Sequence, residues 1–203
     1  MPKRGTVVHP TKTALLVCVA ELLDTHQISE INVELVCQTS GISLGSLYHH
    51  HNDLPSLIDT ALVYRFTRFI DAAIAQMNEA IASSQNKDEF FAGLKVITRT
   101  TQARELVNAR LERAGSHHRA ANSPSFRMQL GAEQQRLTDE LAQIIATSQA
   151  KGWVNPEIDS RAGAVMLQAY SLGRVVDDIA SNQMDDQKWV ELIDMVADKV
   201  FSA

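Results

Sequence analysis

Residues 32–50 of the chain read NVELVCQTSGISLGSLYHH. Asn32 is suited to cap a short helix that runs to Ser40, because its side-chain oxygen can accept a hydrogen bond from a free backbone N–H of the first turn. Gly41 then supplies a turn, since glycine adopts left-handed backbone angles without steric cost. Ser43 is suited to cap a second short helix. The stretch therefore predicts two short helices joined by a tight turn, which together form a helix-turn-helix unit.

Helical periodicity continues on both sides of this unit, and no stretch alternates in the way of a β-strand. We predict an all-α chain of about nine helices, in which a small three-helix unit precedes a larger helical body. Outside residues 32–50 the expected helices run from Thr11 or Thr13 to Leu23, from Asn52 or Asp53 to about Ser83, from Asp88 to about Asn108, from Ser123 to Gly152, from Pro156 or Asp159 through Val176, and from Asp185 or Asp186 through Val200, with a short helix and a loop in 109–122.

Composition agrees with a helical protein that buries a sizeable core. The chain has 203 residues, more than one average domain and fewer than two. Hydrophobic residues make up 45%, which is ordinary for a globular protein, whereas aromatic residues make up only 5%. Abundant Ala and Leu with few aromatic side chains favour helices over a sheet.

The sequence carries no sign of a membrane segment or an exported chain. No run approaches the ~18 consecutive apolar residues that a membrane helix needs, and the first residues lack the apolar core of a signal peptide. Cys18 and Cys37 both lie in apolar helical stretches, so we interpret them as small core residues in a reducing compartment. We therefore expect a cytoplasmic protein that does not associate with a membrane.

The segment around the predicted turn resembles the helix-turn-helix of tetracycline-repressor-like (TetR) regulators. Gly41-Ile42-Ser43, then Gly45-Ser46-Leu47-Tyr48 and His50, match the family pattern, with one helix before them and a long helical body after them. The resemblance implies a DNA-binding domain over 8–68, whose last helix is a shared connector, and an effector-binding and dimerisation domain over 69–203. It implies a homodimeric transcriptional regulator of palindromic operators, acting as a repressor that a small apolar effector releases.

In such a motif the second helix enters the major groove, and residues near its N-terminus reach the base edges. Leu47, three residues after Leu44, would hold this helix to the core. By resemblance Tyr48 would contact a phosphate, and Lys3 and Arg4 could form an arm in the minor groove, although a disordered tail is an equal alternative for those two. The residues that we expect to contact DNA are Lys3, Arg4, Asn32, Ser43, Leu44, Gly45, Ser46, Tyr48, His49 and His50.

The charge of the N-terminal region leaves a second function open. The first sixty residues hold three basic and six acidic side chains, besides five histidines, although phosphate neutralisation by Lys and Arg supplies much of DNA affinity. Leu54 stands where the family often has a lysine that touches phosphate, and His51 stands where phenylalanine is common. The alternative is a TetR-like ligand sensor or protein-interaction module in which DNA binding is weakened or lost.

The body offers candidates for an effector site and a subunit interface. An apolar set between Tyr64 and Tyr170 would line the effector pocket, although for any one member ordinary core packing is the simpler explanation. The last two helices would form a four-helix contact between subunits, unless their apolar stripes face the monomer's own core. The pocket candidates are Phe90, Phe91, Leu94, Phe126, Leu130, Met166 and Tyr170, and the interface candidates are Ala162, Ala169, Gly173, Trp189, Leu192 and Val196.

We expect no metal, cofactor or catalytic site. The run His49-His50-His51 cannot chelate one ion, because consecutive helical residues point about 100° apart. The sequence contains no nucleophile elbow, glycine-rich phosphate loop or paired-acid motif. Asp177-Asp178 and Asp185-Asp186 flank a helix junction, where capping accounts for them.

Overall fold

The computed structural model describes residues 9–203, and every regular element in that range is helical apart from one isolated β-bridge between Val154 and Ser202. The predicted all-α class is therefore confirmed. Backbone contacts divide the chain into two compact units, the first ending at Arg68 and the second spanning Phe69–Ala203. No helix of the described range is both long and apolar enough to cross a bilayer.

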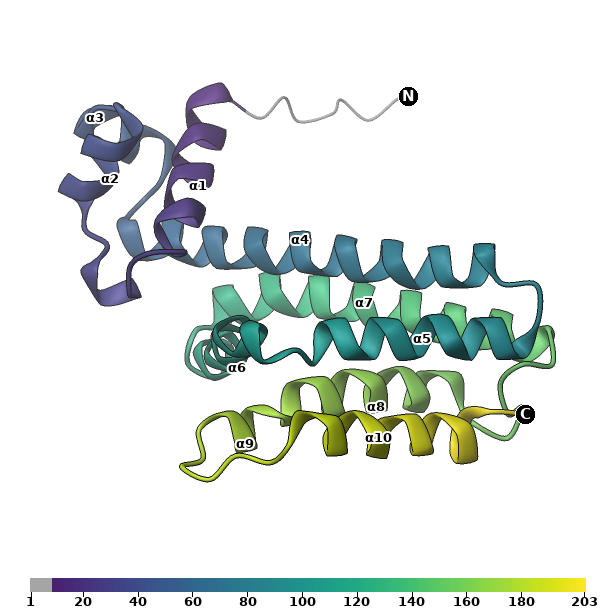
Figure 1. Cartoon of the computed structure of the whole chain (residues 1–203). Helices are drawn as coiled ribbons and strands as arrows, with labels where there is room; N and C mark the ends of the chain where they lie inside the picture. Colours follow the sequence, from purple (N-terminus) through teal and green to yellow (C-terminus); the bar gives the residue numbers. More distant parts are fainter. Residues whose placement is uncertain (1–8) are drawn as a thin grey trace, which may run out of the picture. The chain divides into compact units, whose positions relative to one another are not determined.

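The first unit is built from three short helices and the start of a long one (Figure 1). Helix α1 packs against both α2 and α3, and α2 packs against α3. Leu15, Val36, Leu47 and Leu57, one from each helix, are fully buried and form the core of the unit. The helices are α1 (Pro10–Leu22), α2 (Val33–Ser40), α3 (Leu44–His50) and α4 (Leu54–Ser83), with a 3-10 turn at Ile28–Glu30.

The predicted helix-turn-helix boundaries are confirmed by the caps that set them. The side chain of Asn32 accepts a hydrogen bond from the Leu35 N–H at 2.9 Å, and α2 ends at Gly41, whose φ of 68° lies in the left-handed region. Ser43 then caps α3 by accepting from the Ser46 N–H at 3.3 Å. Asp53 accepts from the Ser56 N–H at 2.7 Å at the start of α4.

The second unit is a helical body around the paired helices α7 and α8 (Figure 1). Helix α6 packs against α7, and α10 packs against α5. Leu137, Leu141 and Ile144 lie at helical spacing on the buried face of α7. The helices are α5 (Lys87–Thr101), α6 (Val107–Asn122), α7 (Pro124–Ala150), α8 (Ser160–Gly173), α9 (Val175–Asp178) and α10 (Asp186–Val196), with a 3-10 turn at Arg104–Leu106 and a π-helical turn at Ala197–Phe201.

Residues 102–122 differ from the sequence prediction. Helix α5 ends at Thr101 rather than near Asn108, because the chain turns so that the Gln102 side chain enters the interior and hydrogen-bonds to Ser171 and Trp189. The following segment is one continuous helix, α6, rather than a short helix and a loop. Gly115 costs an α-helix only about 1 kcal/mol, which the tertiary contacts of α6 exceed.

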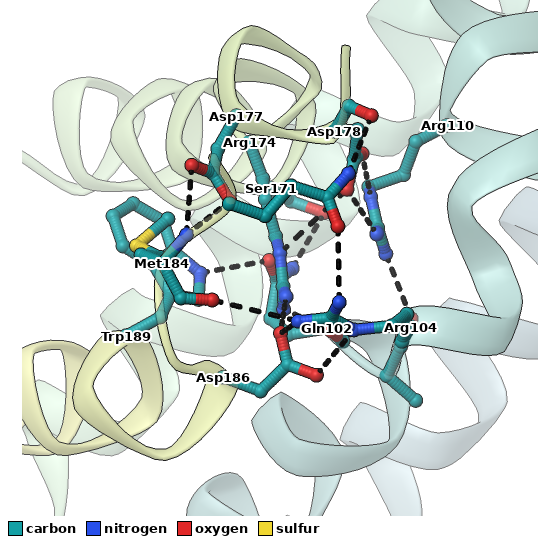
Figure 2. A network of polar contacts seen from close by, with 12 residues as sticks. Gln102, Arg104, Arg110, Ser171, Arg174, Asp177, Asp178, Met184, Asp186 and Trp189 are labelled. Carbon is teal, nitrogen blue, oxygen red and sulfur yellow. Dashed lines mark hydrogen bonds and ion pairs between the residues drawn. The ribbon is translucent and has the colours of Figure 1, made fainter. Parts of the chain in front are cut away.

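A buried ion pair holds α6 to α9, and a second pair joins the C-terminal end of α8 to the start of α10 (Figure 2). Arg110, whose side chain is 0% exposed, donates to both oxygens of Asp178 at 2.6 and 2.8 Å and to the Ala103 carbonyl. Arg174, also buried, pairs with Asp186 and donates to the Gln102 carbonyl. Because both guanidinium groups are removed from water, loss of either carboxylate would leave a buried positive charge without its partner.

We predict that Asp178→Ala lowers the free energy of unfolding by about 3–5 kcal/mol, because it leaves Arg110 buried without its carboxylate. Urea unfolding of the full chain measures the change. Asp139→Ala, which breaks an exposed pair with Arg161, is the matched control and should leave the midpoint nearly unchanged. Equal effects of the two substitutions would contradict the structural role of the buried pair.

Candidate nucleic-acid interface

Helix α3 buries one side chain completely and presents most of the others to solvent. Leu47 is 0% exposed, whereas Leu44 is 53% and Tyr48 is 50% exposed. Ser43, Gly45 and His49 are exposed as well, and Ser46 and His50 are half-buried. About half of the surface of Leu44 and of Tyr48 is left uncovered by their own unit. The outer face of α3 is therefore available to a partner.

Gly45 lies on this exposed face without any packing reason for being glycine. A Cβ atom built at this position would meet nothing within 4 Å. Glycine inside a helix costs roughly 0.5–1 kcal/mol relative to alanine. The fold therefore tolerates a residue that weakens α3 slightly and allows another molecule to approach its backbone closely.

A group of histidines and one lysine adjoins α3, and we call it the histidine cluster: His9, Lys12, His49 and His50. The His50 ring centroid lies 4.5 Å from that of His9 and 4.9 Å from that of His49. Desolvation lowers the pKa of His50, and the neighbouring His9, His49 and Lys12 lower it further. Because these neighbours lower the pKa of His50 through their positive charge, a phosphate bound beside it would favour its protonated form.

His9 and Lys12 belong to this surface, although the sequence did not indicate them as DNA-contact residues. His9 is the N-cap of α1, where its Nδ1 atom accepts from the Thr11 N–H at 3.3 Å. The packing of α1 against α3 brings this helix start beside His50. In the sequence, His9 followed by Pro10 indicates the start of a helix. Only the packing of that helix shows that His9 lies beside His50.

Asn32, another predicted DNA contact, lies in surroundings that are less favourable for binding a phosphate. The Asn32 side-chain oxygen is occupied as the cap of α2, and Glu34 lies in the first turn of the same helix. Asp53 places a second carboxylate at the start of α4. Acidic groups at these helix N-termini compete with phosphate for the free N–H groups. Lys3 and Arg4 lie outside the described residues.

His51 differs from the histidine cluster because its side chain is buried, at 7% exposure. Among residues 9–203 its Nε2 atom has no hydrogen-bond partner. Desolvation lowers the pKa of His51, and the positive charges of Lys12 and His50 lower it further. Since the unfolded chain takes up this proton at about pH 6.5 and the folded chain only at lower pH, stability falls as the pH falls through that value.

We predict that His51→Phe raises the free energy of unfolding by about 1 kcal/mol at pH 7.5, because it removes a buried polar atom without a partner. The variant should also lose part of the decline in stability between pH 7.5 and 5.5. Thermal or urea unfolding at both pH values measures this. His118→Gln, on the exposed side of α6, serves as the control, and an unchanged pH dependence in His51→Phe would contradict the assignment.

The candidate effector residues do not all lie in the interior. Phe90, Phe91, Phe126 and Leu130 are buried, and the Phe90 ring lies 5.5 Å from that of Trp153, which the sequence analysis did not single out. Leu94 and Tyr170 are half-buried. The Tyr170 hydroxyl lies 3.5 Å from that of Thr98, and desolvation raises its pKa. Met166 is 42% exposed and faces away from the core.

The comparisons with known proteins agree on one fold. No family model matches the chain. The HTH-type transcriptional regulator UidR of Escherichia coli K12 is 22% identical over 177 residues, which cover 87% of this chain and 86% of UidR. A TetR-family regulator from Rhodococcus sp. is 21% identical, with a TM-score of 0.62 over 93% of this chain and 98% of its own. One from Mesorhizobium loti is 11% identical, with a TM-score of 0.72 over 95% and 97%.

The chain has the fold of TetR-family transcriptional regulators. Within this TetR fold, α8 carries an exposed stripe of small and apolar residues. Val165 is 51% and Met166 is 42% exposed, and both lie among the interface candidates Ala162, Ala169 and Gly173, which are exposed too. On α10, Leu192 and Met195 are each 49% exposed. The two outer helices of the body therefore present apolar side chains that their own unit does not cover.

Two of the interface candidates are partly engaged within the TetR-fold body itself. Trp189 is half-buried, and its indole N–H donates to the Gln102 side-chain oxygen at 3.0 Å. Val196, at the end of α10, is half-buried as well. The exposed stripe of α8 and Leu192 therefore remain as the stronger interface candidates.

Proposed function

We propose that this chain is a DNA-binding transcriptional regulator, acting as a cytoplasmic homodimer that represses its target and is released by a small effector. The observation that carries the proposal is α3, in which Leu47 is buried while Leu44, Gly45 and Tyr48 face solvent. UidR and the TetR-fold neighbours are transcriptional regulators. We infer no catalytic role.

In this proposal α3 lies in the major groove, with its Ser43-capped N-terminus toward the base edges. Leu44 would contact a thymine methyl group, and Ser46 would hydrogen-bond to a base edge. Tyr48 would hold a phosphate, and the histidine cluster would supply positive charge beside it. Because α3 carries no Arg, Lys, Asn or Gln, we expect sequence readout to depend on close fit and apolar contact.

Dimerisation would double this contact with DNA. Two copies of the α8 stripe, joined by Leu192 and Met195 of α10, would bury apolar side chains that are otherwise in water. The small residues Ala162, Ala169 and Gly173 would let the two α8 helices approach closely. A symmetric dimer of this kind would place two α3 helices on the half-sites of a palindromic operator.

The second candidate function is a ligand sensor that has lost DNA binding. The carboxylates of Glu34 and Asp53 at two helix N-termini of the first unit favour it, because both would repel phosphate. The exposed Tyr48 and the open space around Gly45 favour DNA binding. The two functions make opposite predictions for the following experiment.

We expect the purified chain to retard DNA from its own upstream region in a mobility-shift assay, with an affinity that falls steeply as salt rises. Tyr48→Ala should weaken binding more than about tenfold, through loss of a phosphate contact, while the dimer stays intact by size-exclusion chromatography. Met128→Ala, at a 73% exposed position of α7, is the control. Absence of retardation at low salt would favour the sensor function.

Gly45→Ala offers a test that separates binding from folding. Alanine should raise the free energy of unfolding by roughly 0.5–1 kcal/mol, since it favours the helix and its methyl group meets no atom of the protein. The same methyl group should weaken retardation of the upstream DNA by keeping the backbone of α3 away from the groove. A variant that is more stable and binds DNA as tightly as before would refute the assigned position of α3.

A further inference from the structure

Helix α6 turns a polar face toward the interior of the body. Its buried residues are Arg110 and Ser116, and the half-buried Arg113 lies between them at helical spacing. Interior faces of helices are normally apolar. A helix that buries a guanidinium and a hydroxyl on this face needs polar partners, either from the protein or from a ligand.

The protein supplies those partners for two of its interior arginines. Arg110 has both oxygens of Asp178 and the Ala103 carbonyl, and Arg174 has Asp186 and the Gln102 carbonyl (Figure 2). Of the guanidinium nitrogens of these two arginines, only the Arg174 Nε atom has no hydrogen bond within the described residues, and it lies 3.9 Å from an oxygen of Asp178. Each of these positive charges is thus balanced by a carboxylate at short range.

Arg113 is held in a different way. Its guanidinium carbon lies 4.4 Å from the centroid of the Phe69 ring, on α4. In the described part of the chain its Nε atom is buried and has no hydrogen-bond partner. A cation–π contact of this kind offsets only part of the cost of burying the positive charge. The hydrogen-bonding capacity of the Arg113 Nε atom is therefore unused by the described residues.

The electrostatic surroundings of Arg113 indicate which charge a molecule bound beside it would carry. Burial lowers the pKa of Arg113, and the positive charge of Arg110, one turn away, lowers it further. Both effects mean that the cation is held in an unfavourable place. An anion beside the guanidinium would offset desolvation and repulsion together, and a planar carboxylate or a phosphate can accept two parallel hydrogen bonds from it.

We propose that Arg113 is the anchor of an anion-binding site in the body, and that the effector is a small molecule with a carboxylate or phosphate group next to an apolar part. Phe69 positions the guanidinium and contacts the adjoining part of the ligand. This inference rests on the proposed function, in which the body takes an effector, and it replaces a purely apolar effector by an anionic one. Arg113 is a binding residue here, whereas Arg110 and Arg174 are structural.

The test uses the full-length chain without DNA, so that its outcome is independent of operator binding. Thermal unfolding is followed at fixed ionic strength with inorganic phosphate and with two matched pairs, benzoate against benzamide and hexanoate against hexanamide. Wild-type protein should bind each carboxylate at least about tenfold more tightly than its amide, as expected for a charge-assisted hydrogen bond. Phosphate should raise the melting temperature as well.

Arg113→Met keeps the length and apolar stem of the side chain and removes its charge. It should unfold at the same or a higher temperature without ligand, and it should bind acid and amide equally. Arg127→Met removes an exposed arginine of α7 and should keep the wild-type preference. If wild-type protein does not prefer the carboxylates, or if Arg113→Met retains the preference, the proposal is overturned. Retardation of DNA by the same samples reports separately on the proposed function.

Discussion

The burial of Leu47 is the constraint on which the recognition surface depends. Its side chain is fully buried, and α3 packs against both α1 and α2. Because α3 has only seven residues, it would not be stable alone, and tertiary packing supplies its stability. One anchored side chain in so short a helix determines which residues turn outward. The exposure of Leu44 and Tyr48, and the position of the histidine cluster, follow from it.

The second unit is organised by charge as well as by apolar packing. Its core contains the expected apolar side chains of α7, but α6 is held in place through the buried pair of Arg110 with Asp178. Such pairs add little net stability compared with apolar contacts, yet they are costly to break. They therefore favour one arrangement of α6 against α9 and α10. Arg113, on the same helix, differs in being held by an aromatic ring rather than by a carboxylate.

Local signals accounted for most of the fold. Asn32, Gly41 and Ser43 act where the sequence placed them, and Asp53 is the one of two expected residues that caps α4, because caps and left-handed turns depend on residues only a few positions apart. The prediction was wrong where a distant partner decides the structure. Helix α5 ends at Thr101 because the Gln102 side chain hydrogen-bonds to Ser171 and Trp189. Residues 109–122 remain helical because Arg110 forms an ion pair with Asp178. All three partners lie more than sixty positions away along the chain.

The sequence by itself determined the class of the fold, the helix-turn-helix and the residues of α3 that face outward, since helical periodicity and capping are local properties of the chain. Only the tertiary structure decided which charges and rings meet. It brought His9 to His50, separated Met166 from the buried aromatic residues, and left the Arg113 Nε without a partner among residues 9–203. The reason is that electrostatic and hydrogen-bonding partners are chosen by distance in space, and spacing along the chain does not encode that distance.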